Sequence, residues 1–145
     1  MTIKGQQDVL NNLSRFSSGM RKKLAQQVAD TADDVRNNAM KSMTREEKTG
    51  TVYTNRGANL GDHQASAAGE APASDTGNLV GSIHIKEQGL RAYVFTPTEY
   101  GLYLEFGTAA IAPRPWLRPA LQKAMPEFKK SIQKAFDDAE RGFDR

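Results

Sequence analysis

The segments YGLYLEFGT (residues 100–108) and RPWLRPAL (residues 114–121) lie close together and are rich in aromatic residues and proline. In the first, apolar side chains recur at helical spacing, which predicts a short helix, and Gly107 is placed to cap its C-terminus. In the second, two prolines fix the backbone torsion φ, and Pro119 stands where the first turn of a helix tolerates proline. Together they predict a short helix, a stiff connection and the start of a final helix.

A long amphipathic helix is predicted from Leu117 onward. Its apolar positions, with steps of three or four residues, are Leu117, Leu121, Met125, Phe128, Ile132, Phe136, Ala139 and Phe143. Pro126 lies within this run and removes one backbone donor, so it predicts a kink or a restart of the helix.

A β-hairpin is predicted on the N-terminal side of the short helix. Residues 79–86 (LVGSIHIK) alternate in strand fashion, residues 87–89 (EQG) provide a turn, and residues 91–96 (RAYVFT) are β-branched and aromatic. Pro97 ends the second strand. Because two strands alone are marginally stable, the hairpin is expected to lie against a helix or to pair with further strands.

Residues 48–77 show no periodicity and are rich in small, polar, glycine and proline residues. Such a stretch of about 30 residues is uncommon in a compact domain and is typical of a functional loop or of one that a partner orders. Disorder in the free subunit is the alternative, and the pattern does not separate the two. Val52 and Tyr53 predict a short strand near the start of this loop.

A long amphipathic helix is also predicted at the N-terminus. Its apolar positions are Val9, Leu13, Phe16, Met20, Leu24, Val28, Ala32, Val35, Ala39 and Met43. The segment SSG (residues 17–19) predicts a kink or a break, with Ser18 as the N-cap of a second helix. The predicted fold is one α+β domain over residues 1–145, with a long N-terminal helix, a small antiparallel sheet built on a hairpin, and a C-terminal helix.

The composition agrees with a single domain of 145 residues, in which 38% are hydrophobic and 26% charged. The mean hydropathy of −0.63 predicts that part of the chain is solvated loop or contacts a partner. The absence of cysteine excludes disulfides and thiolate metal sites. No segment approaches the ~18 apolar residues needed to cross a bilayer, and residues 1–7 show no secretory signal, so a cytoplasmic protein without membrane contact is expected.

The net charge of +3 is unevenly distributed. Residues 1–50 contain nine Lys/Arg and six Asp/Glu, residues 114–145 contain eight and five, and residues 51–113 contain three and six. Solvated helix faces explain this division, and charge complementarity between neighbouring copies is the alternative. A continuous nucleic-acid-binding patch has little support, because acidic residues are interleaved with the basic ones.

No catalytic, cofactor-binding or metal site is predicted, and the protein is expected not to be an enzyme. Nucleophilic catalysis needs a base within reach of a nucleophile. His84 falls in a predicted strand, and His63 follows Asp62 in the glycine-rich loop with no further His or Cys nearby to complete a zinc site. Neither GxxxxGK(S/T) nor GxGxxG occurs, so a phosphate-binding loop has no support.

Glu105 is the one acidic residue in an apolar setting, between Leu104 and Phe106. A carboxylate buried there would need a partner. Arg114 and Arg118, just beyond the short helix, are the natural candidates, so a structural ion pair with one of them is predicted.

Two parts of the chain together resemble the family of small tailed-phage neck and tail-completion proteins, also described as minor tail, head–tail joining or tail-terminator-like proteins. In one part, TGNL (residues 76–79) runs into the SI of residues 82–83, and the other part is residues 100–121. In that family a Thr-Gly-x-Leu loop feeds a strand with Ser-Ile, and a Glu-Phe-Gly-Thr turn precedes Ala-Arg-Pro-Phe-Leu-Arg-Pro-Ala.

The resemblance covers roughly residues 63–121, and the flanking helices agree in kind and order. Two departures stand out: Pro113 precedes Arg114, and Trp116 occupies the position where Phe is usual. Both changes keep the stiff, aromatic character of the segment, so the resemblance stands.

The resemblance implies a structural virion protein that forms an oligomeric ring in the neck, closing the tail tube or joining the tail to the head. The chain itself is the first implied partner, with a hexamer the favoured stoichiometry. The tail tube protein and head-completion or connector proteins are the others, and DNA would pass only as cargo in the lumen. The implied location is the virion, and the host cytoplasm during assembly. Tail-terminator, tail-completion and head-side joining roles stay open.

Two other classes of function are alternatives. One is a nucleic-acid-binding protein that uses the basic N- and C-terminal helices, and the other, with weaker support, is a small hydrolase. Salt-dependent DNA binding would distinguish the first, because phosphate contacts weaken steeply with salt.

One subunit contact is predicted at residues 114–118, where Trp116 stands between Arg114 and Arg118. Trp and Arg dominate protein–protein hot spots. The alternative is that Trp116 fills the core of its own domain.

A second contact is predicted from charge and from the N-terminal apolar stripe. Leu13, Met20, Leu24 and Val28 form a stripe that the rest of the domain is expected to leave partly uncovered. In a ring, the basic helix face of one copy would meet the acidic middle of the next copy. The residues concerned are Arg21, Lys22 and Lys23 on the basic side, and Glu70, Asp75 and Glu99 on the acidic side.

Overall fold

The computed structural model describes residues 6–54 and 61–143. Their elements, in chain order, are α1 (Gln6–Thr44), β1 (Val52–Tyr53), β2 (His63–Gln64), α2 (Asn78–Gly81), β3 (His84–Gln88), β4 (Arg91–Phe95), α3 (Glu99–Phe106) and α4 (Leu117–Phe143). β1 pairs with β2 and β3 pairs with β4, in both cases antiparallel. The predicted α+β fold, with a long N-terminal helix, a hairpin and a C-terminal helix, is confirmed.

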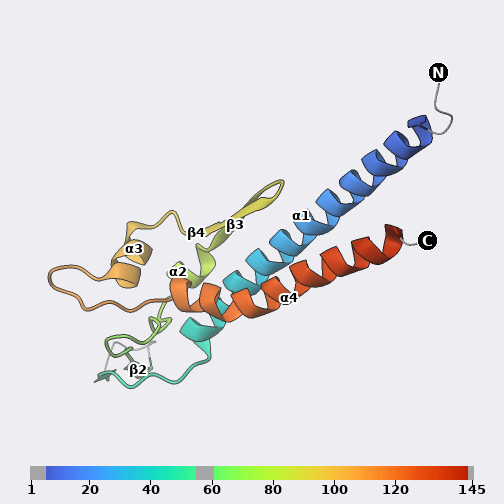
Figure 1. Ribbon diagram of the computed structural model, residues 1–145. Helices are drawn as coiled ribbons and strands as arrows, with labels where there is room; N and C mark the ends of the chain where they lie inside the picture. Colours follow the sequence, from blue (N-terminus) through green and yellow to red (C-terminus); the bar gives the residue numbers. More distant parts are fainter. Residues whose placement is uncertain (1–5, 55–60, 144–145) are drawn as a thin grey trace.

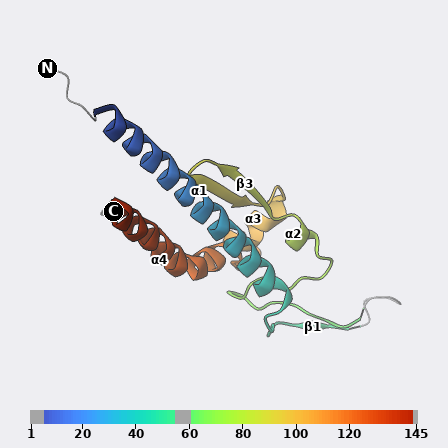
Figure 2. The same ribbon diagram turned by 90° about the vertical axis from the view of Figure 1, so that its right-hand side faces the viewer.

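The two long helices form an antiparallel pair (Figure 1). The β3–β4 hairpin lies against α1, as was expected of a hairpin that is marginally stable alone (Figure 2). α2, α3 and the β1–β2 ribbon gather at one end, which we call the head. The N-terminal part of α1 (residues 10–28) and the C-terminal part of α4 (residues 128–141) extend from it as a stem.

The core lies in the head, where both long helices meet the smaller elements. Its buried side chains are Val35, Ala39, Met43, Leu79, Ile83, Leu104, Trp116, Ala120 and Ala124. Ile83, which follows α2, is the largest side chain that is fully buried, at 1% exposed. Alanines on both long helices keep the intervening side chains short, so the helix axes can approach closely.

α1 continues without interruption through residues 17–19, so the predicted break is wrong. The Ser18 hydroxyl donates to the carbonyl oxygen of Arg15 at 2.9 Å, within the same helix, and caps nothing. α4 likewise continues through Pro126, so the helix does not restart there. Each helix is supported along its length by the other, and this tertiary packing outweighs weak local propensity.

The apolar stripe of α1 is better covered than predicted. Met20, Leu24 and Val28 are half-buried, whereas Leu13 is 53% exposed. The cause is the length of α4, which at 27 residues runs back along α1 far enough to cover all but the beginning of the stripe.

Residues 78–81 form the short helix α2 rather than the first half of a strand, which corrects the prediction. Gly77 precedes the helix with φ 76°, a left-handed conformation that glycine adopts without steric cost. The N–H and the hydroxyl of Ser82 both donate to the carbonyl oxygen of Leu79, at 3.1 and 2.9 Å, and close the helical turn.

The hairpin therefore starts later than predicted, at His84. Its register pairs His84 with Phe95 and Gln88 with Arg91. The turn consists of Gly89 and Leu90 and so begins two residues later than predicted, with Gly89 at φ 61° as its left-handed residue. The placement of His84 in a strand is confirmed.

The predicted short strand at Val52–Tyr53 is confirmed, and it pairs with His63–Gln64. At the base of this β1–β2 ribbon, the Gly50 N–H donates to the Ala65 carbonyl oxygen at 3.0 Å. A Cβ atom at Gly50 would lie 2.5 Å from that oxygen, so the close approach requires glycine.

The rest of the predicted loop, up to residue 77, is bound to its own domain. The Gly69 N–H donates to the Pro113 carbonyl oxygen at 2.9 Å, and the Ser74 N–H donates to the Met43 carbonyl oxygen at 3.1 Å. Ser66 is 5% exposed. Residues 55–60, which the predicted loop also includes, lie outside the described residues.

Candidate functional site

The N-terminus of α4 is capped by Glu105, which belongs to another helix. One carboxylate oxygen, Oε2, accepts the N–H groups of Trp116 at 2.7 Å and Leu117 at 2.8 Å, and Oε1 accepts the N–H of Arg118 at 3.0 Å. The first N–H groups of a helix have no partner within it, and the helix dipole favours negative charge there. This cap therefore fixes the angle between α3 and α4.

Glu105 thus accepts backbone N–H groups rather than a guanidinium, and no ion pair joins it to the side chain of Arg114 or Arg118 in the described part of the chain. Arg114 Nε donates to the Ser66 carbonyl oxygen at 3.2 Å, and the Arg118 guanidinium lies 5.7 Å from the centre of the Phe106 ring. The reason is local: α4 begins after Trp116, a residue that cannot cap a helix, so its N–H groups need an acceptor from elsewhere.

Trp116 fills the core of its own domain. The indole is 3% exposed, and its Nε1–H donates to the Gly101 carbonyl oxygen at 2.9 Å. Of the two interpretations of this residue, the structure supports the internal one, and Trp116 is not available as a surface contact. The same glycine lets α3 lie close to the segment that follows β4, because a Cβ atom at Gly101 would lie 2.5 Å from Thr96 Cγ2.

α3 is apolar on nearly every side, yet only one side of it is buried. Gly101 and Leu104 face the core. The remaining large apolar side chains are exposed: Tyr100 by 59%, Leu102 by 56%, Tyr103 by 45% and Phe106 by 60%. A helix that is apolar all round is normally buried on all sides, so this surface is typical of one that a partner covers.

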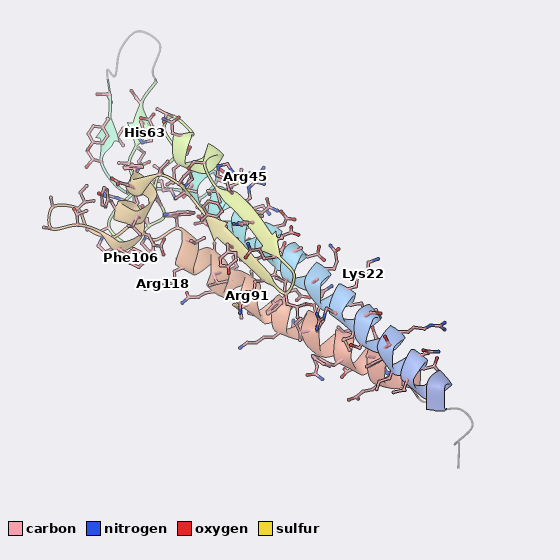
Figure 3. The ribbon with its side chains drawn as sticks, turned by 90° about the horizontal axis from the view of Figure 1, so that it is seen from above. Lys22, Arg45, His63, Arg91, Phe106 and Arg118 are labelled. Atoms are coloured by element: carbon pink, nitrogen blue, oxygen red, sulfur yellow. The ribbon has the colours of Figure 1, made fainter. Side chains whose placement is uncertain are left out.

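A groove of about 410 Å³ lies beside this surface, between β4, α3 and the start of α4. We call it the α3–α4 groove. Its exposed apolar lining consists of Phe95, Leu102, Phe106 and Leu121. A second apolar groove of about 290 Å³ shares Val94, Leu117 and Leu121 with it and continues along α4. Figure 3 shows Phe106 and Arg118 together at the end of the molecule that contains the groove.

The predicted basic face of α1 is divided. Consecutive residues of a helix point about 100° apart, so Arg21, Lys22 and Lys23 cannot share one face. Lys23 lines a groove between α1 and α4 together with Lys130 and Lys134, and the acids Glu127 and Asp138 line it too. Lys22 lies on the side of α1 away from α4 (Figure 3). The interleaved acids give no continuous track for nucleic-acid phosphates.

The carboxylate of Glu70 organises the loop of its own chain. It accepts the hydroxyl and the N–H of Thr49 and, at 2.8 Å, the N–H of Ala67. The Thr49 hydroxyl, followed by the Ala67 and Thr49 N–H groups, lowers the pKa of Glu70 below its ordinary value. Asp75, the second predicted acid, lies near His63, with Oδ1 and Nδ1 3.9 Å apart.

The described residues contain no cluster of three or more His, Cys, Asp or Glu side chains that could hold a metal ion. Within the same part of the chain, no helix has the length and apolar character to cross a membrane. The hydroxyl groups of Ser82, Thr96 and Thr98 form a short chain, with oxygens 2.7 and 2.9 Å apart. They hold α2 to the end of β4.

Sequence reasoning missed the α3 surface, although the signal was present. The eight residues of α3 include Tyr100, Leu102, Tyr103, Leu104 and Phe106, which is more apolar side chains than a one-sided helix can bury. The spacing predicts the helix, and the number of apolar side chains, which is larger than one face can bury, predicts the exposed surface.

The sequence was compared with known protein families, curated proteins and solved structures. A family model described as "Bacteriophage HK97-gp10, putative tail-component" matches residues 7–107. No curated protein matches the chain, and no solved structure matches it. The matched residues cover well over half of the sequence, from α1 through α3 to Gly107, and they confirm the resemblance to tailed-phage neck and tail-completion proteins. The chain therefore belongs to the HK97-gp10-like family of bacteriophage tail components, which are structural proteins of the virion.

Proposed function

We propose that this tail component is a non-enzymatic ring subunit of the neck, which closes the tail tube or joins it to the head. The observation that carries the proposal is the exposed apolar surface of α3. Tyr100, Leu102, Tyr103 and Phe106 are each at least 45% exposed on a helix whose backbone is fixed by the Glu105 cap. A rigid apolar surface of this kind is suited to permanent contact with another subunit.

A ring needs two different surfaces on each subunit, because a head-to-tail contact joins one patch to another and closes by rotation. The α3 surface is one of them. The charges of the stem are part of the other: Lys23, Lys130 and Lys134, beside the α1–α4 groove, would face the acids of the next copy.

The fold leaves fewer acidic side chains for this contact than the sequence predicts. Because Glu70 already accepts three hydrogen bonds from Thr49 and Ala67, Glu99, which is exposed, is the better candidate to meet a neighbour. Arg118, which is exposed beside Phe106, adds a cation at the edge of the α3 surface. Arg114 is half-buried and bonded to Ser66, so it contributes to the fold rather than to the contact.

The proposal is tested by locating the protein in assembled particles. Electron microscopy of virions that carry a small tag on the chain should show the tag as a ring at the junction of head and tail. Phage in which Phe106→Glu replaces the wild-type residue should produce heads and tails that fail to join or tails of irregular length. A label along the length of the tail, or at its distal tip, would contradict the proposed place in the neck.

A further inference from the structure

The β1–β2 ribbon exposes apolar side chains on both of its faces. Val52 and Tyr53 are each 53% exposed. Neighbouring residues of a strand point to opposite faces, so neither face of the ribbon is covered by its own chain. Strands that carry apolar residues on both faces are typical of strands that lie between two layers.

The ribbon is too small to be stable without support, since it consists of two residues on each strand. Two backbone hydrogen bonds of 3.0 and 2.9 Å join its flanking segments to each other at the base. Arg114 Nε, which donates to the Ser66 carbonyl oxygen at 3.2 Å, attaches this base to the rest of the domain. In Figure 3 the ribbon, which carries the labelled His63, projects from the same end of the molecule as α3. It is therefore an arm with a fixed base and uncovered apolar side chains on β1.

The α3–α4 groove has the properties that such an arm requires. It is open to solvent, has a volume of about 410 Å³, and is lined mainly by apolar side chains. Thr98 also lines the groove, and its hydroxyl, at the end of the chain of hydroxyl groups, can bond a tyrosine hydroxyl. A buried Tyr normally places its ring in apolar surroundings and its hydroxyl against such a partner.

The arm and the groove each carry an exposed charge, and the two charges are of opposite sign. Asp62 is exposed next to β2. Lys48, which precedes β1, is turned back and donates to the carbonyl oxygen of Ser42 at 2.6 Å. The groove, in turn, has Arg118 at its rim.

We propose that the β1–β2 ribbon of one copy docks in the α3–α4 groove of the next copy. The contact is head-to-tail, since arm and groove are different patches, and it rests on the proposed ring. Tyr53 enters the groove beside Leu102 and Phe106, and Asp62 faces Arg118. The arm thereby covers Leu102 and Phe106, two of the apolar side chains that α3 leaves exposed.

The absence of cysteine from the chain allows a direct test. The full-length variants Tyr53→Cys and Leu102→Cys are purified separately, mixed under assembly conditions and oxidised. A covalent dimer should form in the mixture and not in either variant alone. In the matched control Leu90→Cys replaces Leu102→Cys, because Leu90 is exposed to a similar extent, 48%, at the tip of the other hairpin.

A second measurement uses the charges and does not depend on oxidation. Asp62→Lys and Arg118→Glu should each raise the concentration for half-maximal assembly about tenfold, and the double variant should restore most of the loss. Circular dichroism of each variant should match the wild type, because both side chains are exposed.

The outcomes separate this proposal from the ring itself. If rings of normal mass form but Tyr53→Cys links to Leu102→Cys no better than to Leu90→Cys, the arm lies elsewhere and the ring stands. If the wild-type chain is a monomer both in purified form and in assembled particles, the ring and the arm are both wrong. Independent losses in the two charge variants, with no restoration in the double variant, would also overturn the pairing of arm and groove.

Discussion

The head and the stem of this molecule bury their apolar residues to different degrees. In the head, Trp116 and Leu104 are 3% and 5% exposed, and the surrounding backbone is held by the Glu105 cap. In the stem, Leu10 and Leu13 on α1 and Phe136 on α4 are 51%, 53% and 46% exposed. The head therefore contains the core that stabilises the subunit, beside the exposed apolar surface of α3, whereas the stem is packed only where α1 and α4 face each other.

The largest expected effect is the loss of the Trp116 indole. Trp116→Ala leaves a cavity in the core and removes the bond to the Gly101 carbonyl, and it should lower the free energy of unfolding by about 3–5 kcal/mol. The matched change in the stem, Leu13→Ala, should lower it by less than about 0.5 kcal/mol. Urea unfolding followed by circular dichroism measures both. Similar losses for the two variants would show that head and stem do not differ as described.

A smaller loss is expected when the head is overpacked. Gly101→Ala places a Cβ atom 2.5 Å from Thr96 Cγ2 and 3.0 Å from Leu79 Cδ1, which should cost about 1–3 kcal/mol. In the stem, Gly19 has no atom within 4 Å of an added Cβ, and Gly19→Ala should stabilise the helix by about 0.5–1 kcal/mol. Thermal melting of the two variants shows whether each substitution raises or lowers the melting temperature. A stabilising Gly101→Ala would mean that α3 is more loosely packed than its contacts indicate.

The cap between α3 and α4 should contribute about 0.5–2 kcal/mol, the range for a helix N-cap. Glu105→Ala removes the acceptor of three N–H groups and should lower stability by this amount. Glu87→Ala, at an exposed position of β3, is the control and should change little. If the two variants unfold at the same urea concentration, the cap does not hold the helices together.

The smallest effect concerns pH and the loop. The pKa of Glu70 is lowered from its ordinary value of 4.5, so its stabilising bonds to Thr49 and Ala67 are complete above that value. They are lost as the pH falls through the lowered pKa of the folded state. The difference in unfolding midpoint between wild type and Glu70→Gln should therefore be constant near neutral pH and shrink below about pH 4.5. A difference that grows on acidification would contradict the sign of the shift.

The main elements were predictable because their signals are local and repeated. The apolar stripes of the two long helices, and the Gly107 cap of α3 with φ 76°, follow from spacing alone. The misplaced boundaries have equally local causes. Residues 79–86 alternate like a strand, but the left-handed Gly77 and the hydrogen bond from Ser82 to the Leu79 carbonyl oxygen favour a helical turn at residues 78–81.

The partners of Glu105 and Trp116 were less predictable, since they depend on how distant segments meet. The residues next to Glu105 in the sequence do not indicate that its carboxylate oxygens will accept the N–H groups of residues 116–118 rather than bind a guanidinium. The division of Arg21, Lys22 and Lys23 between faces, by contrast, follows from helix geometry and could have been foreseen.

The mass of the purified protein tests the central claim, that the apolar α3 surface in the head holds subunits together. Native mass spectrometry of the wild-type chain should give one closed assembly at a fixed multiple of 16.0 kDa. The variant Leu102→Glu/Phe106→Glu should give the monomer with unchanged circular dichroism, while Leu90→Glu should assemble like the wild type. Assembly of the Leu102→Glu/Phe106→Glu variant to the wild-type mass would contradict the claim.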